Sequence, residues 1–314
     1  MTMVVLGSIH LDRFAYLTSL PAPGETVIAE RTAQGLGGKG ANQAFAAARS
    51  GADVRFVGAV GADDDGDRAL ETLVEGGVDV SAVLRSDSAT GSAFIMVDSH
   101  GENCIVVTRG ANDEVTADRV SELIERIRPQ LVLSQGELPV EAIEAGARAA
   151  RSVGARFILN LAPFHPLSAE TLASADPLIV NEPESIAILG ADAPDGIRGP
   201  EEAKAAAAKL AADVASSAVV TIGAHGAAAS DGVSSWHVPA LPIDKVVDTT
   251  GAGDIFTGVL VTGLAQGLSL ADAVQRGVIA GGLAVTREGT IAASPTNAEI
   301  AALMPAAEGR MQNS

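Results

Sequence analysis

One stretch of the sequence combines small residues with a carboxylate in a pattern suited to phosphoryl transfer. It reads DTTGAGDIFTG, residues 248–258, and continues as the apolar run IFTGVLVTGLAQG. The apolar run predicts a buried helix with Asp254 in its first turn. Glycine-rich amides at a helix start form a set of N–H donors for an anion. A carboxylate beside them could take a hydroxyl proton while the amides of residues 251–254 stabilise charge on the transferred group.

A helix cap is the alternative interpretation of these residues. An N-cap needs one acceptor side chain, which Asp254 could supply, with the glycines forming a turn. That account leaves Gly251, Gly253 and the earlier Asp248 unexplained. We therefore favour catalysis over capping at this position.

A second glycine-rich stretch, QGLGGKGANQAFAAA, covers residues 34–48. It contains the G-x-G-x-x-G spacing of dinucleotide sites, but the preceding ERTAQ is not the hydrophobic strand that such a site requires. A Walker A loop is excluded because Lys39 is followed by glycine, where Ser or Thr would bind the metal. The stretch predicts a turn leading into a helix from residue 41, with Lys39 and Asn42 facing a ligand. A flexible turn with a solvated lysine is the alternative.

Short β-rich runs alternate with amphipathic helical patterns along most of the chain. The runs are MVVLG, VRFVGAVG, LVLSQGE, RFILNLAP, PLIVNE and AVVTIG, at 3–7, 54–61, 131–137, 156–163, 177–182 and 218–223. Strands that are apolar on both faces, between such helices, are typical of a mostly parallel sheet covered on both sides. We predict a doubly wound α/β fold, with residues 1–314 as a single domain.

Two regions, about 11–34 and 90–110, depart from this alternation. The first holds the turn PAPGE and a possible strand, TVIAERT, and the second reads as a hairpin, SAFIMVD and CIVV joined by a polar turn. Neither region has a helix to cover its second face. They predict a small β-sheet that projects as a lid or an oligomer contact.

Polar residues recur where the predicted strands end. These residues are His10, Asp12, Glu137, Asn181 and Thr221, with Glu184 three residues after Asn181 and glycines at 223 and 226. Each alone is ordinary turn chemistry. Together they fall at the carboxyl edge of the predicted sheet, where ligands bind in open α/β folds. Asn181 and Glu184 could hold Mg²⁺ through its waters, and the 221–226 loop could lie under a nucleotide.

Composition excludes several classes of function. The chain has 21 basic and 39 acidic residues, a net charge of −18, which argues against a nucleic-acid partner. Cys104 is the only cysteine, so no internal disulfide or cysteine-based zinc site forms, as expected in a reducing cytoplasm. The N-terminus does not read as a signal peptide. No charge-free apolar stretch reaches the roughly 18 residues that span a membrane.

The two glycine-containing stretches together resemble the signatures of the ribokinase family of carbohydrate kinases, also called the phosphofructokinase-B family. GGKGANQAFAAA and DTTGAGDIFTG carry the resemblance, and GSIHLD, PAPGET, VNEPE, TIGAHGA and AVTREG extend it over about residues 3–300. The resemblance implies the doubly wound fold with a β-sheet lid, often paired in a homodimer. It implies transfer of the γ-phosphate of ATP to a sugar hydroxyl, with the 5-hydroxyl of D-ribose as the first expectation, and use of Mg²⁺ and K⁺.

The resemblance also assigns roles by position. Asp254 would be the base, with Gly251, Ala252 and Gly253 in the anion hole. The sugar ligands would be His10, Asp12, Gly38, Lys39, Asn42, Glu137 and Asp254. ATP would contact Asn181, Thr221, Gly223, Gly226 and Gly253, with Glu184 near Mg²⁺. The K⁺ positions would be Asp248, Thr250, Ala284, Arg287, Gly289 and Ser294, several through backbone carbonyls.

Two positions depart from the family pattern. His10 stands where asparagine is usual, so the acceptor could be ribose with altered contacts, another sugar, deoxyribose or a nucleoside. Val278 stands where a polar contact to adenine is common and could pack on the base instead. A catalytically silent sugar- or nucleotide-binding regulator is a further alternative, against which Asp254 and Lys39 argue. A dehydrogenase is less favoured still.

Overall fold

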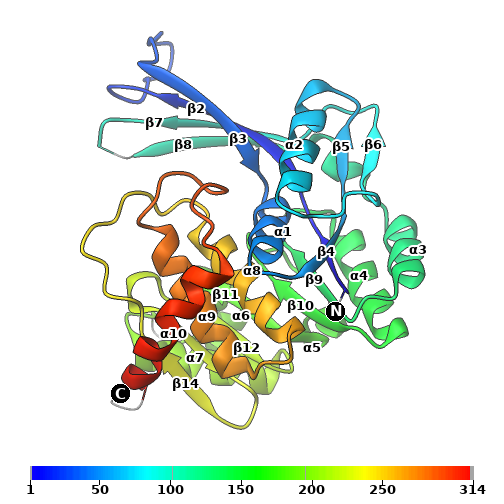
Figure 1. Ribbon diagram of the computed structural model, residues 1–314, viewed down its shortest axis with the longest axis vertical. Coiled ribbons are helices and arrows are strands. Elements are labelled where there is room, and N and C mark those ends of the chain that lie inside the picture. The colour runs from blue at the N-terminus through cyan, green and yellow to red at the C-terminus, as the bar shows by residue number, and fades with distance from the viewer. Residues whose placement is uncertain (1, 101, 195, 312–314) are drawn as a thin grey trace.

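An eight-stranded sheet forms the centre of the molecule in the computed structural model, which describes residues 2–100, 102–194 and 196–311 (Figure 1). Its strands run in the order β14-β13-β12-β11-β10-β9-β1-β4. Their bounds are β1 Thr2–Leu6, β4 Asp53–Val57, β9 Leu131–Gln135, β10 Arg156–Asn160, β11 Ala175–Asn181, β12 Ala218–Thr221, β13 Ala227–Ser230 and β14 Ser235–Val238. Neighbours from β4 to β12 are parallel, and only the β13 and β14 pairings are antiparallel. The predicted mostly parallel sheet is confirmed.

Helices cover both faces of this sheet because its strands are apolar on both sides. In β1, Val4 and Leu6 pack into one core layer, and Met3 and Val5 into the other. The first layer holds α3 (Ala117–Ile127), α4 (Val140–Val153), α5 (Ala169–Ala173), α6 (Glu182–Leu189) and α7 (Pro200–Asp213). The second holds α1 (Lys39–Arg49), α2 (Asp64–Glu75), α8 (Ala252–Ala265) and α9 (Leu270–Ala284), with α10 (Asn297–Met311) against α9. None of the helices in the described residues is long and apolar enough to span a membrane.

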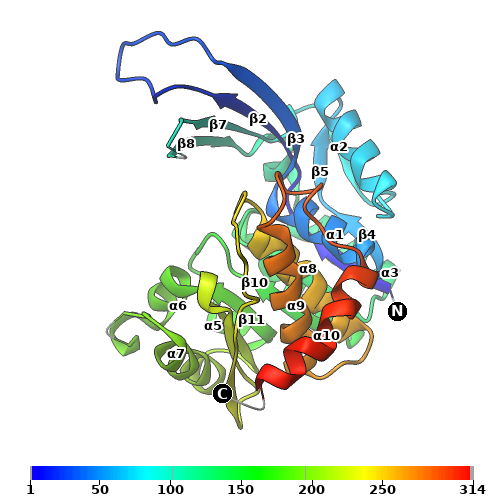
Figure 2. The same cartoon turned by 60° about the vertical axis from the view of Figure 1, so that its left-hand side comes forward.

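A four-stranded sheet projects from this body (Figure 2). Its order is β3-β2-β7-β8, with bounds β2 His10–Tyr16, β3 Arg31–Gly37, β7 Ser92–Val97 and β8 Asn103–Thr108. The predicted hairpin is confirmed as β7 and β8. The strand expected at 26–32 begins later, at Arg31. β2 ends at Tyr16, which pairs with Arg31, so the earlier residues have no neighbouring strand.

A third sheet of two strands, β5 (Ala59–Gly61) and β6 (Leu84–Ser86), divides the run expected as one strand at 54–61. Short 3₁₀ helices lie at η1 (Gly110–Glu114), η2 (Gly190–Asp192) and η3 (Gly223–His225).

The projecting sheet joins the body where two of its strands meet the predicted site. β2 begins at His10, four residues after β1, and β3 ends at Gly37, two residues before α1. His10 and Asp12 therefore lie inside the small sheet, not in a loop at the end of β1. A Cβ at position 37 would lie 2.1 Å from Oδ2 of Asp12, so only glycine leaves room for that carboxylate.

Candidate functional site

Asp254 lies in the first turn of α8, as predicted. The N-cap is Gly251, whose φ of 72° lies in the left-handed region that favours glycine. No side chain caps this helix, so Asp254 does not act as an N-cap. The first amides of an α-helix have no partner within it. Here the Ala252 backbone N donates to the Thr249 carbonyl at 3.3 Å, and the amides of Gly253 and Asp254 are the ones placed to meet an anion. The Asp254 side chain itself is buried, with 6% of the residue exposed.

Three side chains of α1 contact the Asp254 carboxylate. Asn42 Nδ2 donates to Oδ2 at 3.2 Å, and Gln43 Nε2 donates to Oδ1 at 2.9 Å. Lys39 Nζ lies 3.7 Å from Oδ1. Positions 39, 42 and 43 share one helix face, so the two glycine-containing stretches meet across α1 and α8. The negative charge of Asp254 raises the pKa of Lys39, outweighing the effect of burial, and the lysine stays protonated.

The solvated-lysine interpretation is therefore wrong. The helix also begins at Lys39, not at residue 41, with Gly38 as its N-cap at a φ of 86°. Glu137 explains this earlier start. Its Oε2 accepts hydrogen bonds from the backbone N of Lys39 at 2.9 Å and from Ser8 Oγ at 2.6 Å.

Two titratable groups of β2 face the same cluster. Burial raises the pKa of Asp12 to about 7, and the charges of Glu137 and Asp254 act in the same direction. Burial lowers the pKa of His10, although the charge of Glu137 opposes the shift. Asp12 therefore titrates near neutral pH, and His10 is a neutral imidazole there.

Several buried polar atoms around this cluster have no hydrogen-bond partner among the described residues. They are His10 Nε2, Asp12 Oδ1, Asn42 Oδ1, Gln43 Oε1 and both amide atoms of Gln135. Buried polar groups in proteins are normally hydrogen-bonded. Such a mixed set of donors and acceptors matches a small ligand with several hydroxyl groups.

A cavity of about 600 Å³ lies at the other side of the α8 N-terminus. Its apolar wall includes Leu241, Pro242, Ile243, Val246, Phe256, Val278 and Val285. Its polar or glycine-rich wall includes Asn181, Glu182, Thr221, Gly223, Gly226 and Thr249, with Ala252 and Gly253 from α8. The structure thus brings all five residues predicted to contact the nucleotide together around one cavity. Asp254 links this cavity to the cluster around Lys39.

Asn181 and Glu184 form a reciprocal cap at the start of α6. Asn181 Oδ1 accepts from the Glu184 backbone N, and Glu184 Oε2 accepts from the Asn181 backbone N, both at 2.9 Å. Burial raises the pKa of Glu184, whereas the hydrogen bond from Asn181 and the charge of Lys39 oppose that shift. Among the described residues no group of three His, Cys, Asp or Glu side chains is arranged to hold a metal ion. A Mg²⁺ ion here would therefore depend on phosphate oxygens and water for most of its ligands.

The positions expected to bind K⁺ lie at the end of α9, at Ala284, and on the loops beside α8 and α9. Asp248 Oδ1 accepts from the Thr250 backbone N, and its Oδ2 from the Gly289 backbone N, both at 2.9 Å. These bonds lower the pKa of Asp248 although burial acts against them, so it stays ionised. Ser294 Oγ is buried without a partner among the described residues, whereas the Arg287 side chain pairs with Glu299. The carbonyl of Ala284 accepts from the Arg287 backbone N at 3.0 Å.

Sequence reasoning missed several residues of this site. They are Ser8, Gln43, Gln135 and Asn160, all buried and polar. Ser8 and Gln43 lie within the two stretches already singled out, in GSIHLD and KGANQ. Gln135 and Asn160 end the apolar strands β9 and β10 and pair in register. A polar residue that ends an apolar run was the signal that could have identified both.

The sequence matches a known family of kinases. The profile of the pfkB family carbohydrate kinases matches residues 2–297. A ribokinase of Haemophilus influenzae is 34% identical over 301 residues, covering 95% of this chain and 96% of that protein. A deoxyribokinase of Salmonella typhi is 30% identical over 301 residues, covering 94% and 96%.

Solved structures share the same fold. Ribokinase from Thermotoga maritima superposes with a TM-score of 0.87 at 29% identity, covering 97% of this chain and 99% of that one. Ribokinase of Arabidopsis thaliana, complexed with ribose and ATP, superposes with a TM-score of 0.86 at 30% identity, covering 96% and 98%.

Proposed function

The chain belongs to the pfkB family of carbohydrate kinases, and we propose that it transfers the γ-phosphoryl group of ATP to the 5-hydroxyl of D-ribose. One observation carries this proposal. The Asp254 carboxylate contacts the Lys39 and Asn42 side chains, while the adjacent Gly253 borders the 600 Å³ cavity. A group at that junction could reach an acceptor on one side and a phosphate on the other. The Arabidopsis relative bound to ribose and ATP supports this choice of substrates.

In this proposal the sugar lies beneath the small sheet and ATP fills the cavity. The unpartnered polar atoms of His10, Asp12 and Asn42 would bind sugar hydroxyls, together with Glu137 and the backbone at Gly38. The apolar wall of the cavity would hold the adenine, with Val278 packed on the base. The ribose and phosphates of the nucleotide would lie along the polar and glycine-rich wall, at Asn181, Thr221, Gly223 and Gly226.

Asp254 would act as the general base. Its carboxylate accepts the proton of the 5-hydroxyl as that oxygen forms a bond to the γ-phosphorus, and the bond from the γ-phosphorus to the β-phosphate bridge breaks, releasing ADP. The first amides of α8, at residues 251–254, would stabilise the negative charge on the moving group. Lys39, held protonated beside Asp254, adds a positive charge at the same place.

Two cations fit the residues present. Glu184 would orient Mg²⁺, which neutralises phosphate charge when bound. K⁺ would lie next to the anion hole, held by the end of α9 and the loops beside it, at Asp248, Thr250, Ala284, Arg287, Gly289 and Ser294. The buried, unpartnered hydroxyl of Ser294 and the ionised Asp248 support that site.

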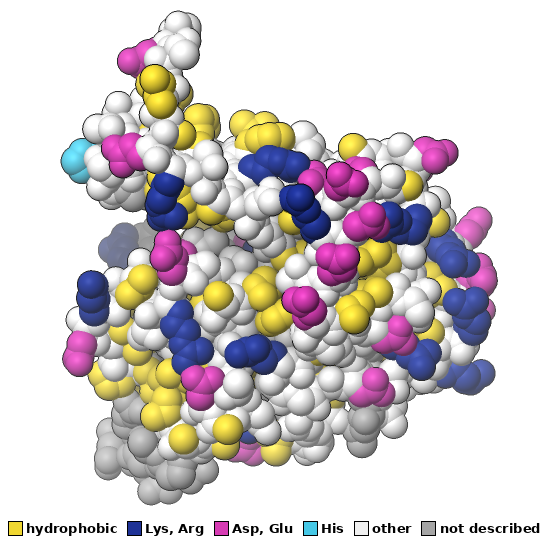
Figure 3. Space-filling view, turned by 45° about the horizontal axis from the view of Figure 1, so that its top comes forward, with side chains coloured by type: hydrophobic (Ala, Val, Ile, Leu, Met, Phe, Trp, Pro, Cys, Tyr) yellow, Lys and Arg dark blue, Asp and Glu magenta, His cyan; other side chains and the backbone are white. Residues whose placement is uncertain are grey.

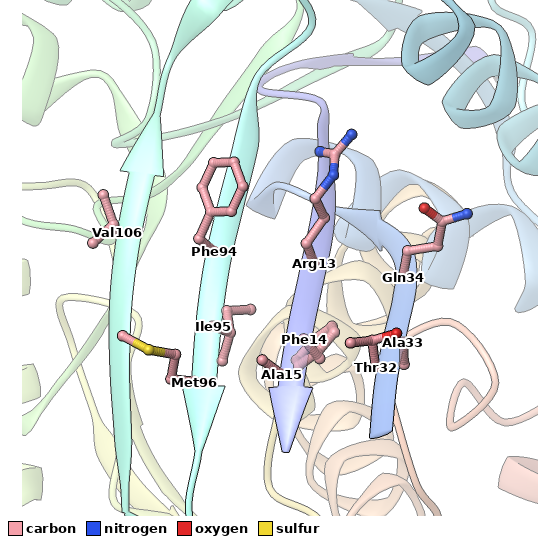
Figure 4. A pocket seen from close by; sticks show the side chains of 10 residues that line it. All are labelled: Arg13, Phe14, Ala15, Thr32, Ala33, Gln34, Phe94, Ile95, Met96 and Val106. Atoms are coloured by element: carbon pink, nitrogen blue, oxygen red, sulfur yellow. The ribbon is translucent and has the colours of Figure 1, made fainter. Parts of the chain in front are cut away.

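The small sheet would pair two copies of the chain. Phe94 and Val106 are 48% and 54% exposed on β7 and β8, where Figure 4 shows them near Met96. A pocket of about 820 Å³ lies against these strands. Large exposed apolar side chains in one sheet mark an interaction surface. On the face shown in Figure 3, acidic and basic side chains are interspersed, a pattern unlike the basic surface of a nucleic-acid binder.

Replacing the base tests the proposal. Asp254→Asn should keep the fold and sugar binding, measured by calorimetry, and lower kcat by about 10²–10⁴-fold. Turnover equal to wild type would show that Asp254 is not the base. If the wild-type protein binds sugar but transfers no phosphate in the presence of Mg²⁺ and K⁺, the chain is a binding protein and not a kinase.

His10 favours a second candidate, a kinase for deoxyribose or a nucleoside. The residue is 4% exposed, and its Nε2 has no partner among the described residues, so this nitrogen is free to bind a ligand group. The similarity to a deoxyribokinase supports the same candidate. An ADP-release assay across ribose, 2-deoxyribose, fructose and several nucleosides separates the two. A higher kcat/KM for anything but ribose would overturn the first choice.

A further inference from the structure

A chain of side-chain amides connects Asp254 to the central sheet. Gln43 in α1 is fully buried, and its Nε2 donates to Asp254 Oδ1 at 2.9 Å and to Asn160 Oδ1 at 2.7 Å. Asn160 ends β10, and its Nδ2 donates to the backbone oxygen of Ile179 in β11 at 3.0 Å. The carboxylate is therefore fixed, through two amides, to the backbone of a buried strand.

The two oxygens of the carboxylate are held unequally. Oδ1 accepts from Gln43 at 2.9 Å and lies 3.7 Å from Lys39 Nζ. Oδ2 has one longer contact, 3.2 Å to Asn42, on the side of the unpartnered sugar-site atoms. Because Gln43 holds Oδ1, rotation of the carboxylate is restricted and Oδ2 remains directed toward Asn42.

We propose that Gln43 is a positioning residue, which presents Oδ2 of Asp254 to the acceptor hydroxyl. This inference rests on the proposed function, in which Asp254 is the base. The hydroxyl proton passes to Oδ2, the hydroxyl oxygen bonds to the γ-phosphorus, and ADP leaves with the electrons of the broken bond. In this role Gln43 acts through the Asp254 carboxylate and not on the reacting atoms.

Packing alone does not account for a glutamine at this place. Its neighbours on α1, Ala44, Phe45 and Ala47, are buried and apolar, and methionine would fill a similar volume. Gln43 Oε1 has no partner among the described residues, and burying an unpaired oxygen is unfavourable. The Nε2 atom donates two hydrogen bonds, to Asp254 and Asn160, that a methionine could not form.

Gln43→Met tests the proposal, because it removes both donors and keeps the side-chain length. We expect kcat to fall by about 10- to 100-fold, as for a misplaced catalytic group, with the KM values for sugar and ATP changed less than about threefold. In the Asp254→Asn background the same change should alter the residual rate by less than about twofold, because the two residues act as one unit.

A matched control and a second variant complete the experiment. Gln275→Met makes the same change at another buried helical glutamine, in α9, and should leave kcat at the wild-type value. Asn160→Ala removes the support of Gln43 without touching Asp254 and should lower kcat in the same direction by a smaller factor. If Gln43→Met does not fold, the turnover of Asn160→Ala tests whether Gln43 positions Asp254.

Three results would overturn the proposal: wild-type turnover in Gln43→Met, wild-type turnover in Asn160→Ala, or an equal effect of Gln43→Met with and without Asp254. The proposed function fails on a different result, wild-type turnover in Asp254→Asn.

Discussion

The raised pKa of Asp12 gives a stability prediction with a definite sign. Burial, reinforced by Glu137 and Asp254, raises the pKa of this carboxyl from 3.8 to about 7 in the folded chain. A carboxyl whose folded pKa is raised favours the folded state at low pH and loses that contribution as the pH rises to the folded pKa. One pKa unit corresponds to about 1.36 kcal/mol. Over the two pH units from 5 to 7, the free energy of unfolding can therefore fall by at most about 2.7 kcal/mol through this group. We expect about 2 kcal/mol, because Asp12 is partly accessible to water.

Urea unfolding of wild type and Asp12→Asn at pH 5, 6, 7 and 8 measures this effect. The signal is the fluorescence of Trp236, the only tryptophan. Asparagine does not titrate. The free energy of unfolding of Asp12→Asn should therefore rise by about 2 kcal/mol relative to that of wild type between pH 5 and 7, and by little more above pH 7. Asp87→Asn, at an exposed position, is the control and should follow wild type. A difference between Asp12→Asn and wild type that stays constant from pH 5 to 8 would refute the reasoning.

Three further predictions concern the cation, the small sheet and the anion hole. Replacing K⁺ with tetramethylammonium should lower kcat several-fold, and Asp248→Asn should weaken that response, in a coupled ADP-release assay. Phe94→Asp should convert a dimer into a monomer by light scattering, because it buries a charge in the apolar contact. Gly253→Val should keep the fold, since a Cβ there meets no atom within 4 Å, and should lower turnover by about 10²-fold by filling the phosphate side of the cavity.

Each of these has a control and a contradicting result. Equal rates in K⁺ and tetramethylammonium would show that no K⁺ site contributes to turnover. Val233→Asp, at a residue 93% exposed outside the small sheet, should leave the dimer intact. A wild-type protein that is monomeric at assay concentrations would contradict the pairing. Wild-type turnover in Gly253→Val would show that the first turn of α8 is not where the phosphate lies.

Much of the fold followed from local patterns. Apolar runs without polar alternation predicted the buried parallel strands, and the absence of covering helices at 11–34 and 90–110 predicted a separate small sheet. The bounds of the strands in the small sheet could not be predicted from local patterns. β3 begins at Arg31 because its partner β2 ends at Tyr16, and such a pairing limit is not encoded in the residues of β3 alone.

The sequence identified the candidate site residues that belong to glycine-containing stretches more readily than those that contact the cluster from elsewhere in the chain. Gly38 and Gly251 both adopt left-handed φ values at helix starts, and this local requirement is visible in the sequence. Gln43 joins this cluster through hydrogen bonds to Asp254 and Asn160, which lie more than 100 positions away in the sequence, at 2.9 and 2.7 Å. No periodicity or turn signal reports such contacts. His10 is a similar case, because its neutral state depends on burial created by the fold.

The central claim is that Asp254 lies between acceptor and phosphate and takes the hydroxyl proton. A crystal structure of the chain with ribose, Mg²⁺, K⁺ and a non-hydrolysable ATP analogue tests it directly. The account predicts a carboxylate oxygen of Asp254 within roughly 2.6–3.2 Å of the 5-hydroxyl, with the γ-phosphate against the amides of Gly253 and Asp254. A carboxylate turned away from every sugar oxygen, or a phosphate bound far from the start of α8, would contradict it.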